Sequence, residues 1–89
     1  MPPKVYKVTA TVIKQEGHCD ACHEIGDQFI IGDKTPNGLC AHAYQAIFPF
    51  AMGYRYDARY RWDAEPNRTT LACPDPDNPV VFELTRVEG

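Results

Sequence analysis

Residues with β-branched or aromatic side chains are concentrated near both ends of the chain, where they predict β-strands over residues 5–13 and 80–87. Two shorter segments, 27–31 and 68–73, have the same character and are predicted as further strands. The stretch 54–62 places mostly aromatic residues at even positions and charged ones at odd positions. This two-residue period predicts an extended edge strand with one packed face.

A helical period replaces the two-residue period in the middle of the chain, where apolar residues recur on one face: Leu39, Ala43, Ile47 and Phe50. This spacing predicts one principal helix over about residues 38–48. Asn37 is suited to cap the first turn, and Pro49 is expected to limit the other end. The order of elements predicts an α+β fold, in which a small, twisted, mainly antiparallel sheet packs against this helix.

Composition narrows the class of protein. The 89 residues correspond to a single domain covering 1–89, with 44% hydrophobic and 24% charged residues. The net charge of −3 argues against a nucleic-acid partner, because proteins that grip the phosphate backbone are strongly basic. The longest apolar runs, such as 46–52, are too short to span a membrane. Without the apolar stretch of a signal peptide at its beginning, the chain is expected to be cytoplasmic.

Four cysteines carry the candidate chemistry. Cys19 and Cys22 form a Cys-x2-Cys pair, whereas Cys40 and Cys73 lie far along the chain. Each falls at a predicted junction, in a loop, at the helix start or beside the proline-rich turn, so the loops can bring the four together. In a reducing compartment such thiols favour metal or redox chemistry over disulfides. Thiolates bind iron–sulfur clusters and zinc, and His23 offers an additional ligand.

Three separated motifs, spanning nearly the whole chain, resemble those of a family of small uncharacterised bacterial and archaeal proteins. The first family motif, G-x-C-x-x-G-H-x-x-G-D-x-F, is matched from Gly17 to Phe29. The second, P-x-G-x-C, is matched from Pro36 to Cys40, and the C-P-D-P motif begins at Cys73. The resemblance implies that the shared cysteines are Cys19, Cys40 and Cys73, with His23 close by.

The sequence departs from this family at Cys22, where the family motif has glycine. A site shared with the family would therefore use Cys19, Cys40 and Cys73, completed by His23, another ligand or an open position. On a [4Fe–4S] cluster three thiolates leave one iron open for a substrate, whereas Cys22 as a fourth ligand would close the centre. An iron–sulfur cluster is the favoured cofactor because the ligands are scattered, and zinc is the alternative.

Two other functions compete with a metal centre. A thiol-redox protein would use the Cys19 and Cys22 pair and would fold without metal. A non-catalytic interaction module would instead use the aromatic and arginine residues of the segment 54–62. The metal hypothesis implies a redox or enzyme partner protein, and the aromatic content also favours self-association into a homo-oligomer.

Overall fold

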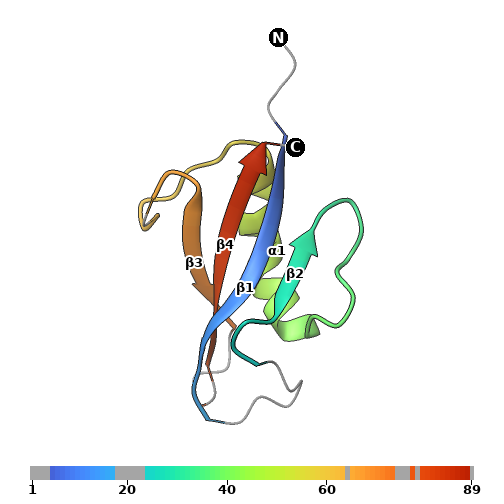
Figure 1. Cartoon of the computed structure of the whole chain (residues 1–89), viewed down its shortest axis with the longest axis vertical. Coiled ribbons are helices and arrows are strands. Elements are labelled where there is room, and N and C mark those ends of the chain that lie inside the picture. The colour runs from blue at the N-terminus through green and yellow to red at the C-terminus, as the bar shows by residue number, and fades with distance from the viewer. Residues whose placement is uncertain (1–4, 18–23, 64, 74–76, 78, 89) are drawn as a thin grey trace.

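Four antiparallel strands form one sheet, and a long helix covers one of its faces (Figure 1). This computed structural model describes residues 5–17, 24–63, 65–73, 77 and 79–88. The strand order is β2-β1-β4-β3. The bounds of the elements are β1 Tyr6–Gln15, β2 Gln28–Ile31, α1 Ala41–Arg55, β3 Arg68–Ala72 and β4 Val80–Glu88. The predicted α+β class and the four predicted strands that compose this sheet are thereby confirmed.

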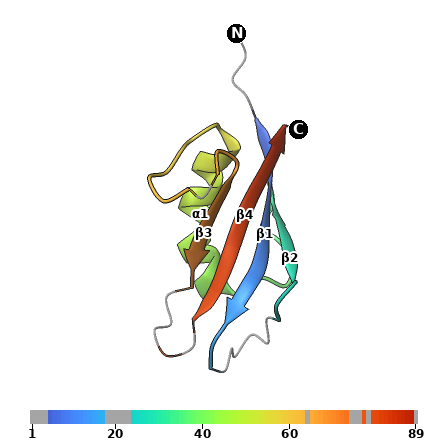
Figure 2. The ribbon, with the colours of Figure 1, turned by 60° about the vertical axis from the view of Figure 1, so that its left-hand side comes forward.

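The core lies between α1 and the face of the sheet that α1 covers (Figure 2). Side chains alternate across a strand, so every second residue of β1 and β4 points into this layer. The strand residues and helix residues that meet there are at most 1% exposed. They are Val8, Ala10, Val12, Ile31, Val80, Phe82 and Leu84 on the sheet, and Ala43, Ile47, Ala51 and Tyr54 on the helix.

The helix continues well beyond Pro49, so the predicted end near residue 48 is wrong. A proline inside a helix removes one hydrogen bond and costs about 3 kcal/mol or more. Here the residues after Pro49 continue the apolar face, because Ala51 and Tyr54 are both fully buried against the sheet. Burial of a large apolar side chain stabilises by about 1.5–3 kcal/mol, and the further helical hydrogen bonds add to this. Tertiary packing therefore outweighs the local cost.

The predicted edge strand over 54–62 is also wrong. Its first two residues end α1, and residues 56–62 form turns and coil. The aromatic rings at alternate positions fold back on the helix, where Tyr54, Tyr60 and Trp62 stack with centroid separations of 5.8 and 5.1 Å. The Tyr60 hydroxyl donates to the Phe50 carbonyl at 2.8 Å. The two-residue period thus serves ring stacking, because the aromatic side chains find their apolar surface on α1 instead of in a sheet.

Gly53 permits this close approach of the 58–60 segment to α1. A Cβ atom at position 53 would lie 2.5 Å from the Tyr60 hydroxyl oxygen and 3.3 Å from Ala58 Cβ. We expect Gly53→Ala to lower the free energy of unfolding by about 1–2 kcal/mol, because overpacking exceeds the gain of about 1 kcal/mol in helix propensity. Urea denaturation measures this change.

Gly32→Ala is the matched control, because nothing lies within 4 Å of the added Cβ there. Its free energy of unfolding should stay within about 0.5 kcal/mol of the wild-type value. If Gly53→Ala proved as harmless as Gly32→Ala, the packing of Tyr60 on the helix would be described wrongly.

Candidate metal centre

One end of the molecule gathers the junctions that carry the candidate ligands, and we call it the cysteine end. Antiparallel pairing places the last residues of β1 and β3 beside the first residues of β2 and β4. The helix α1 also begins at this end (Figures 1 and 2). Cys40 directly precedes α1 and Cys73 directly follows β3. Both therefore lie at junctions, as expected, although the predicted helix over 38–48 and the predicted strand over 68–73 included them. Both are half-buried, and both pack against the same hydrophobic core.

The backbone next to Cys73 holds its sulfur atom in place. The Cys73 N–H donates to the Val80 carbonyl at 3.0 Å, which continues the β3–β4 ladder by one residue. The Val80 N–H donates in turn to Cys73 Sγ at 3.3 Å. These two hydrogen bonds fix the position of the Cys73 sulfur beside the start of β4.

Cys40, and not the predicted Asn37, occupies the N-cap position of α1, because the helix begins at Ala41. Its carbonyl accepts the first helical hydrogen bond from Tyr44 N–H at 2.8 Å, but its side chain makes no capping hydrogen bond. The first turn of α1 contains no acidic residue. Cys40 thus lies at the amino end of α1, where the helix dipole stabilises the negative charge of a bound group.

Three glycines at the cysteine end have positive φ angles. Gly17, Gly26 and Gly38 have φ values of 68°, 98° and 86°, in the left-handed region that other residues rarely adopt. Gly26 donates its N–H to the Val12 carbonyl at 2.8 Å and so joins the start of the β2 segment to β1. These glycines therefore have a structural explanation, because each adopts a backbone conformation that other residues rarely adopt.

The remaining predicted ligands, Cys19, Cys22 and His23, lie outside the described residues. Across the described ranges, which include only two of the five candidate ligands, no group of three or more metal-ligating side chains occurs. His42 is exposed on the first turn of α1.

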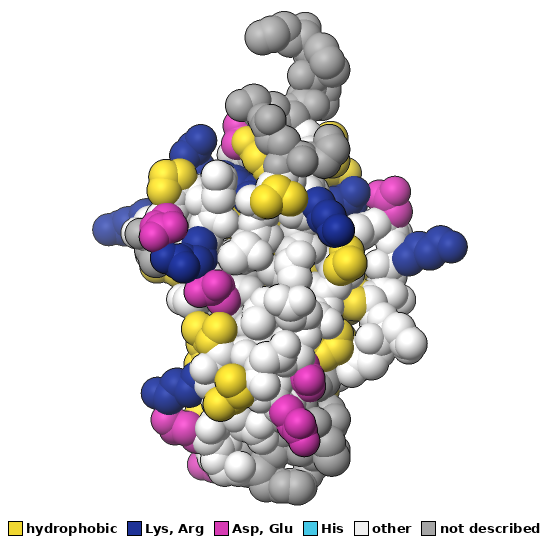
Figure 3. Space-filling view, viewed as in Figure 1, with side chains coloured by type: hydrophobic (Ala, Val, Ile, Leu, Met, Phe, Trp, Pro, Cys, Tyr) yellow, Lys and Arg dark blue, Asp and Glu magenta, His cyan; other side chains and the backbone are white. Residues whose placement is uncertain are grey.

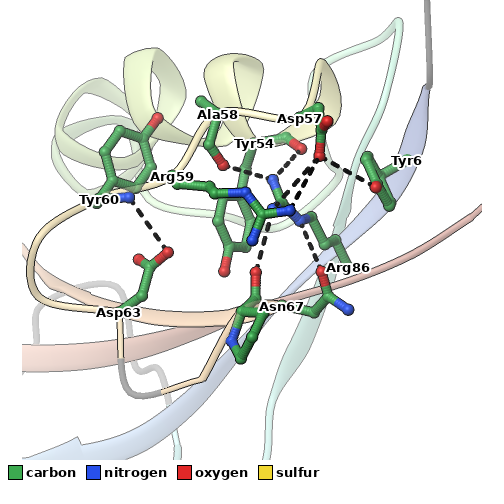
Figure 4. Close-up of polar contacts among 10 residues, drawn as sticks. Tyr6, Tyr54, Asp57, Ala58, Arg59, Tyr60, Asp63, Asn67 and Arg86 are labelled. Carbon is green, nitrogen blue, oxygen red and sulfur yellow. Dashed lines mark hydrogen bonds and ion pairs between the residues drawn. The ribbon is translucent and has the colours of Figure 1, made fainter.

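A second polar cluster lies at the opposite end, around Arg86, and the sequence analysis did not predict it (Figure 4). The Arg86 side chain is fully buried. Its guanidinium donates to Asn67 Oδ1 at 3.1 Å and to three backbone carbonyls, those of Tyr54, Ala58 and Pro66, at 3.0, 2.6 and 3.1 Å. Arg86 Nη2 lies 3.8 Å from Asp57 Oδ1.

The contacts of Arg86 indicate a structural role. Its guanidinium lies 3.9 Å from the centroid of the Tyr54 ring and 4.7 Å from that of Tyr6. Most of its donors are directed at carbonyls of the 54–67 segment, so the charge holds this segment against β4. The sequence does contain a signal for its burial, since position 86 is in phase with the buried residues Phe82 and Leu84.

Two tyrosines beside this cluster differ in their hydrogen bonding. Burial, assisted by Asp63, raises the pKa of Tyr54 above its ordinary value of 10.0. Tyr54 OH is buried and finds no hydrogen-bond partner within the described ranges, whereas Tyr60 OH donates to Phe50. We expect Tyr54→Phe to leave the free energy of unfolding unchanged or to raise it by up to about 1 kcal/mol, whereas Tyr60→Phe loses about 1 kcal/mol.

The raised pKa of Tyr54 determines how the stability of the fold changes with pH. Because the folded state holds the Tyr54 proton more tightly than the unfolded state does, stability falls as pH rises above about 10. Tyr54→Phe should therefore reduce this alkaline loss in urea denaturation between about pH 9 and pH 11. A larger loss for Tyr54→Phe than for Tyr60→Phe at neutral pH would contradict this account.

Among the described residues, no helix has the length and apolar character required to cross a membrane. Comparison of the chain with protein-family models, curated proteins and solved structures finds no match.

Proposed function

We propose that this protein binds a metal centre at the cysteine end, with Cys40 and Cys73 as two of the ligands. The observation that carries the proposal is the position of these two residues. Cys40 precedes the start of α1 and Cys73 follows the end of β3, both at the cysteine end, and both pack on one core. The hydrogen bond from Val80 N–H to Cys73 Sγ and the position of Cys40 at the amino end of α1 also support this proposal.

Chain connectivity supports Cys19 and His23 as further ligands. Gly17 and Glu24 belong to the connection between β1 and β2 at the cysteine end. Cys19 is two residues from Gly17 in the sequence, and His23 is adjacent to Glu24. Cys22 is two residues from Glu24 in the sequence, the same separation as between Gly17 and Cys19. The set Cys19, Cys40 and Cys73 also agrees with the resemblance described above.

An iron–sulfur cluster fits this donor set best, and zinc is the alternative. Soft thiolates bind both, but four ligands drawn from three separate junctions differ from the paired knuckles of common zinc ribbons. A cluster would supply electron transfer, or Lewis-acid chemistry if one iron lacks a protein ligand. Zinc would act as a structural staple for a small core. We propose electron transfer with a redox or enzyme partner in the cytoplasm, where thiols remain reduced.

Purification without oxygen, followed by elemental analysis and absorption spectroscopy, tests this proposal. The proposal predicts brown protein that contains iron and acid-labile sulfide and shows thiolate-to-iron charge-transfer absorption in the visible range. Colourless protein with one zinc per chain would support the metal centre, but with a structural zinc ion in place of the iron–sulfur cluster. Folded, metal-free protein with titratable thiols would overturn the proposal and favour the thiol-redox alternative at Cys19 and Cys22.

A further inference from the structure

Two of the arginines, Arg55 and Arg86, are buried, and they differ in how many of their donors have an acceptor. The Arg86 guanidinium donates to four oxygen atoms, one on Asn67 and three on backbone carbonyls. Within the described ranges the Arg55 guanidinium donates to one oxygen only, Asp33 Oδ1 at 2.9 Å. Its other acceptor is the sulfur of Met52 at 3.9 Å, which is a weak one. Because a guanidinium has five N–H donors, Arg55 retains donors for a further group.

A cavity of about 250 Å³ lies beside Arg55, at the end of the molecule opposite the cysteine end. Its walls are formed by the first residues of β1, the last residues of β2 with the turn that follows, and the end of α1. The apolar side chains of Val5 and Ile30 line it, and they are 41% and 55% exposed. Pockets for drug-sized ligands have volumes of about 300–1,000 Å³, so this cavity suits a compound of few heavy atoms.

The charged groups around the cavity favour an anion. Lys7, Asp33 and Arg55 line it, which leaves an excess of one positive charge. The Asp33 side chain is 91% exposed, so its ion pair with Arg55 has one fully solvated partner and contributes little. A carboxylate that enters the cavity can replace Asp33 on the guanidinium, because the planar fork of arginine matches a carboxylate through two parallel hydrogen bonds.

We propose that this cavity binds a small organic carboxylate, whose oxygens accept from Arg55 and whose apolar part packs on Val5 and Ile30. Inorganic phosphate would make no use of the two apolar side chains, and a neutral compound would make little use of the guanidinium. A protein partner fits less well, because the apolar side chains on the uncovered face of the sheet are interspersed with charged groups of both signs (Figure 3).

Titration of the full chain with butyrate, followed by nuclear magnetic resonance of the backbone amides, tests this site. The proposal predicts saturable shifts at Gly32 and Asp33, which line the cavity, with a dissociation constant of about 1 mM. Butyramide has nearly the same shape without the charge and should bind at least about tenfold more weakly. Acetate should bind about fivefold more weakly, because each fully buried CH₂ group contributes about fourfold and the lining residues are partly exposed.

Two variants of the charged groups test the geometry. Asp33→Asn should strengthen butyrate binding about threefold or more, because it removes the competing carboxylate and its repulsion. Arg55→Lys keeps the charge but loses the paired donors, so it should weaken binding about tenfold. Glu16→Gln is the matched control for Asp33→Asn, since it changes the net charge equally but lies next to the last residue of β1, at the cysteine end. It should leave the affinity for butyrate unchanged.

Amide shifts that fail to saturate below about 50 mM butyrate would overturn the proposal. Equal binding of butyrate and butyramide, tighter binding of phosphate than of butyrate, or equal affinities of Asp33→Asn and Glu16→Gln would also reject it. The Asp33 side chain lies at the surface, so its variant tests the site even if Arg55→Lys proves unstable. None of these variants changes a proposed metal ligand, so their outcomes are independent of the proposed function.

Discussion

Replacing Arg86 by methionine is expected to lower the free energy of unfolding by about 3–5 kcal/mol. Methionine retains much of the aliphatic length but removes every donor. The carbonyls of Tyr54, Ala58 and Pro66 and the side chain of Asn67 would lose their partner in a site where the arginine side chain is fully buried. Urea denaturation should show a lower midpoint with an unchanged slope, which marks a loss of stability without a change in the unfolded state.

Arg59→Met provides the control for this prediction. The Arg59 side chain is 64% exposed and lies 3.9 Å from Asp57, so this ion pair is solvated and contributes little. Its replacement should change the free energy of unfolding by less than about 0.5 kcal/mol. Equal effects of the two substitutions would show that Arg86 does not hold the 54–67 segment.

Replacing Cys73 by serine is expected to weaken metal binding by about a hundredfold. Serine has nearly the same shape, and its oxygen can accept the Val80 N–H that Cys73 Sγ accepts at 3.3 Å, so the β3–β4 connection is retained. The soft thiolate ligand is lost, however. Structural zinc sites bind with about 10–16 kcal/mol in total, so one of four ligands accounts for about 3 kcal/mol, or about a hundredfold in affinity. Metal content after gel filtration measures the loss.

His42→Ala is the corresponding control, because His42 is exposed on α1 close to Cys40 in the chain and is not among the proposed ligands. It should retain the full metal content. The thiol-redox alternative predicts a different outcome for Cys73→Ser, since a disulfide between Cys19 and Cys22 would still form and open reversibly. Unchanged metal content in Cys73→Ser would remove this residue from the proposed site.

The strands of the sheet were predictable because burial on one face imposes a two-residue period. In β4 that period places Val80, Phe82 and Leu84 in the core, as expected. The same period in the segment 54–62 misled the prediction, because stacked rings on a helix surface also produce it. Sequence alone does not reveal whether a neighbouring strand or a neighbouring helix is available to an alternating segment.

The end of α1 and the burial of Arg86 were missed for a related reason. The effect of Pro49 is local, whereas the burial of Ala51 and Tyr54 that outweighs it depends on the sheet. Arg86 is buried only because the backbone carbonyls of the 54–67 segment surround its guanidinium. By contrast, the positions of Cys40 and Cys73 at element junctions followed from local turn and helix signals. Their convergence with Cys19, Cys22 or His23 stays a prediction.

X-ray absorption spectroscopy at the metal edge of the anaerobically purified protein tests the central claim most directly. The account predicts a first coordination shell dominated by sulfur at about 2.3 Å, with Cys40 and Cys73 thiolates among the scatterers. This shell should be lost or should lose sulfur in the Cys73→Ser variant. A shell of oxygen and nitrogen atoms alone at about 2.0–2.1 Å, or protein without bound metal, would contradict a cysteine-ligated centre.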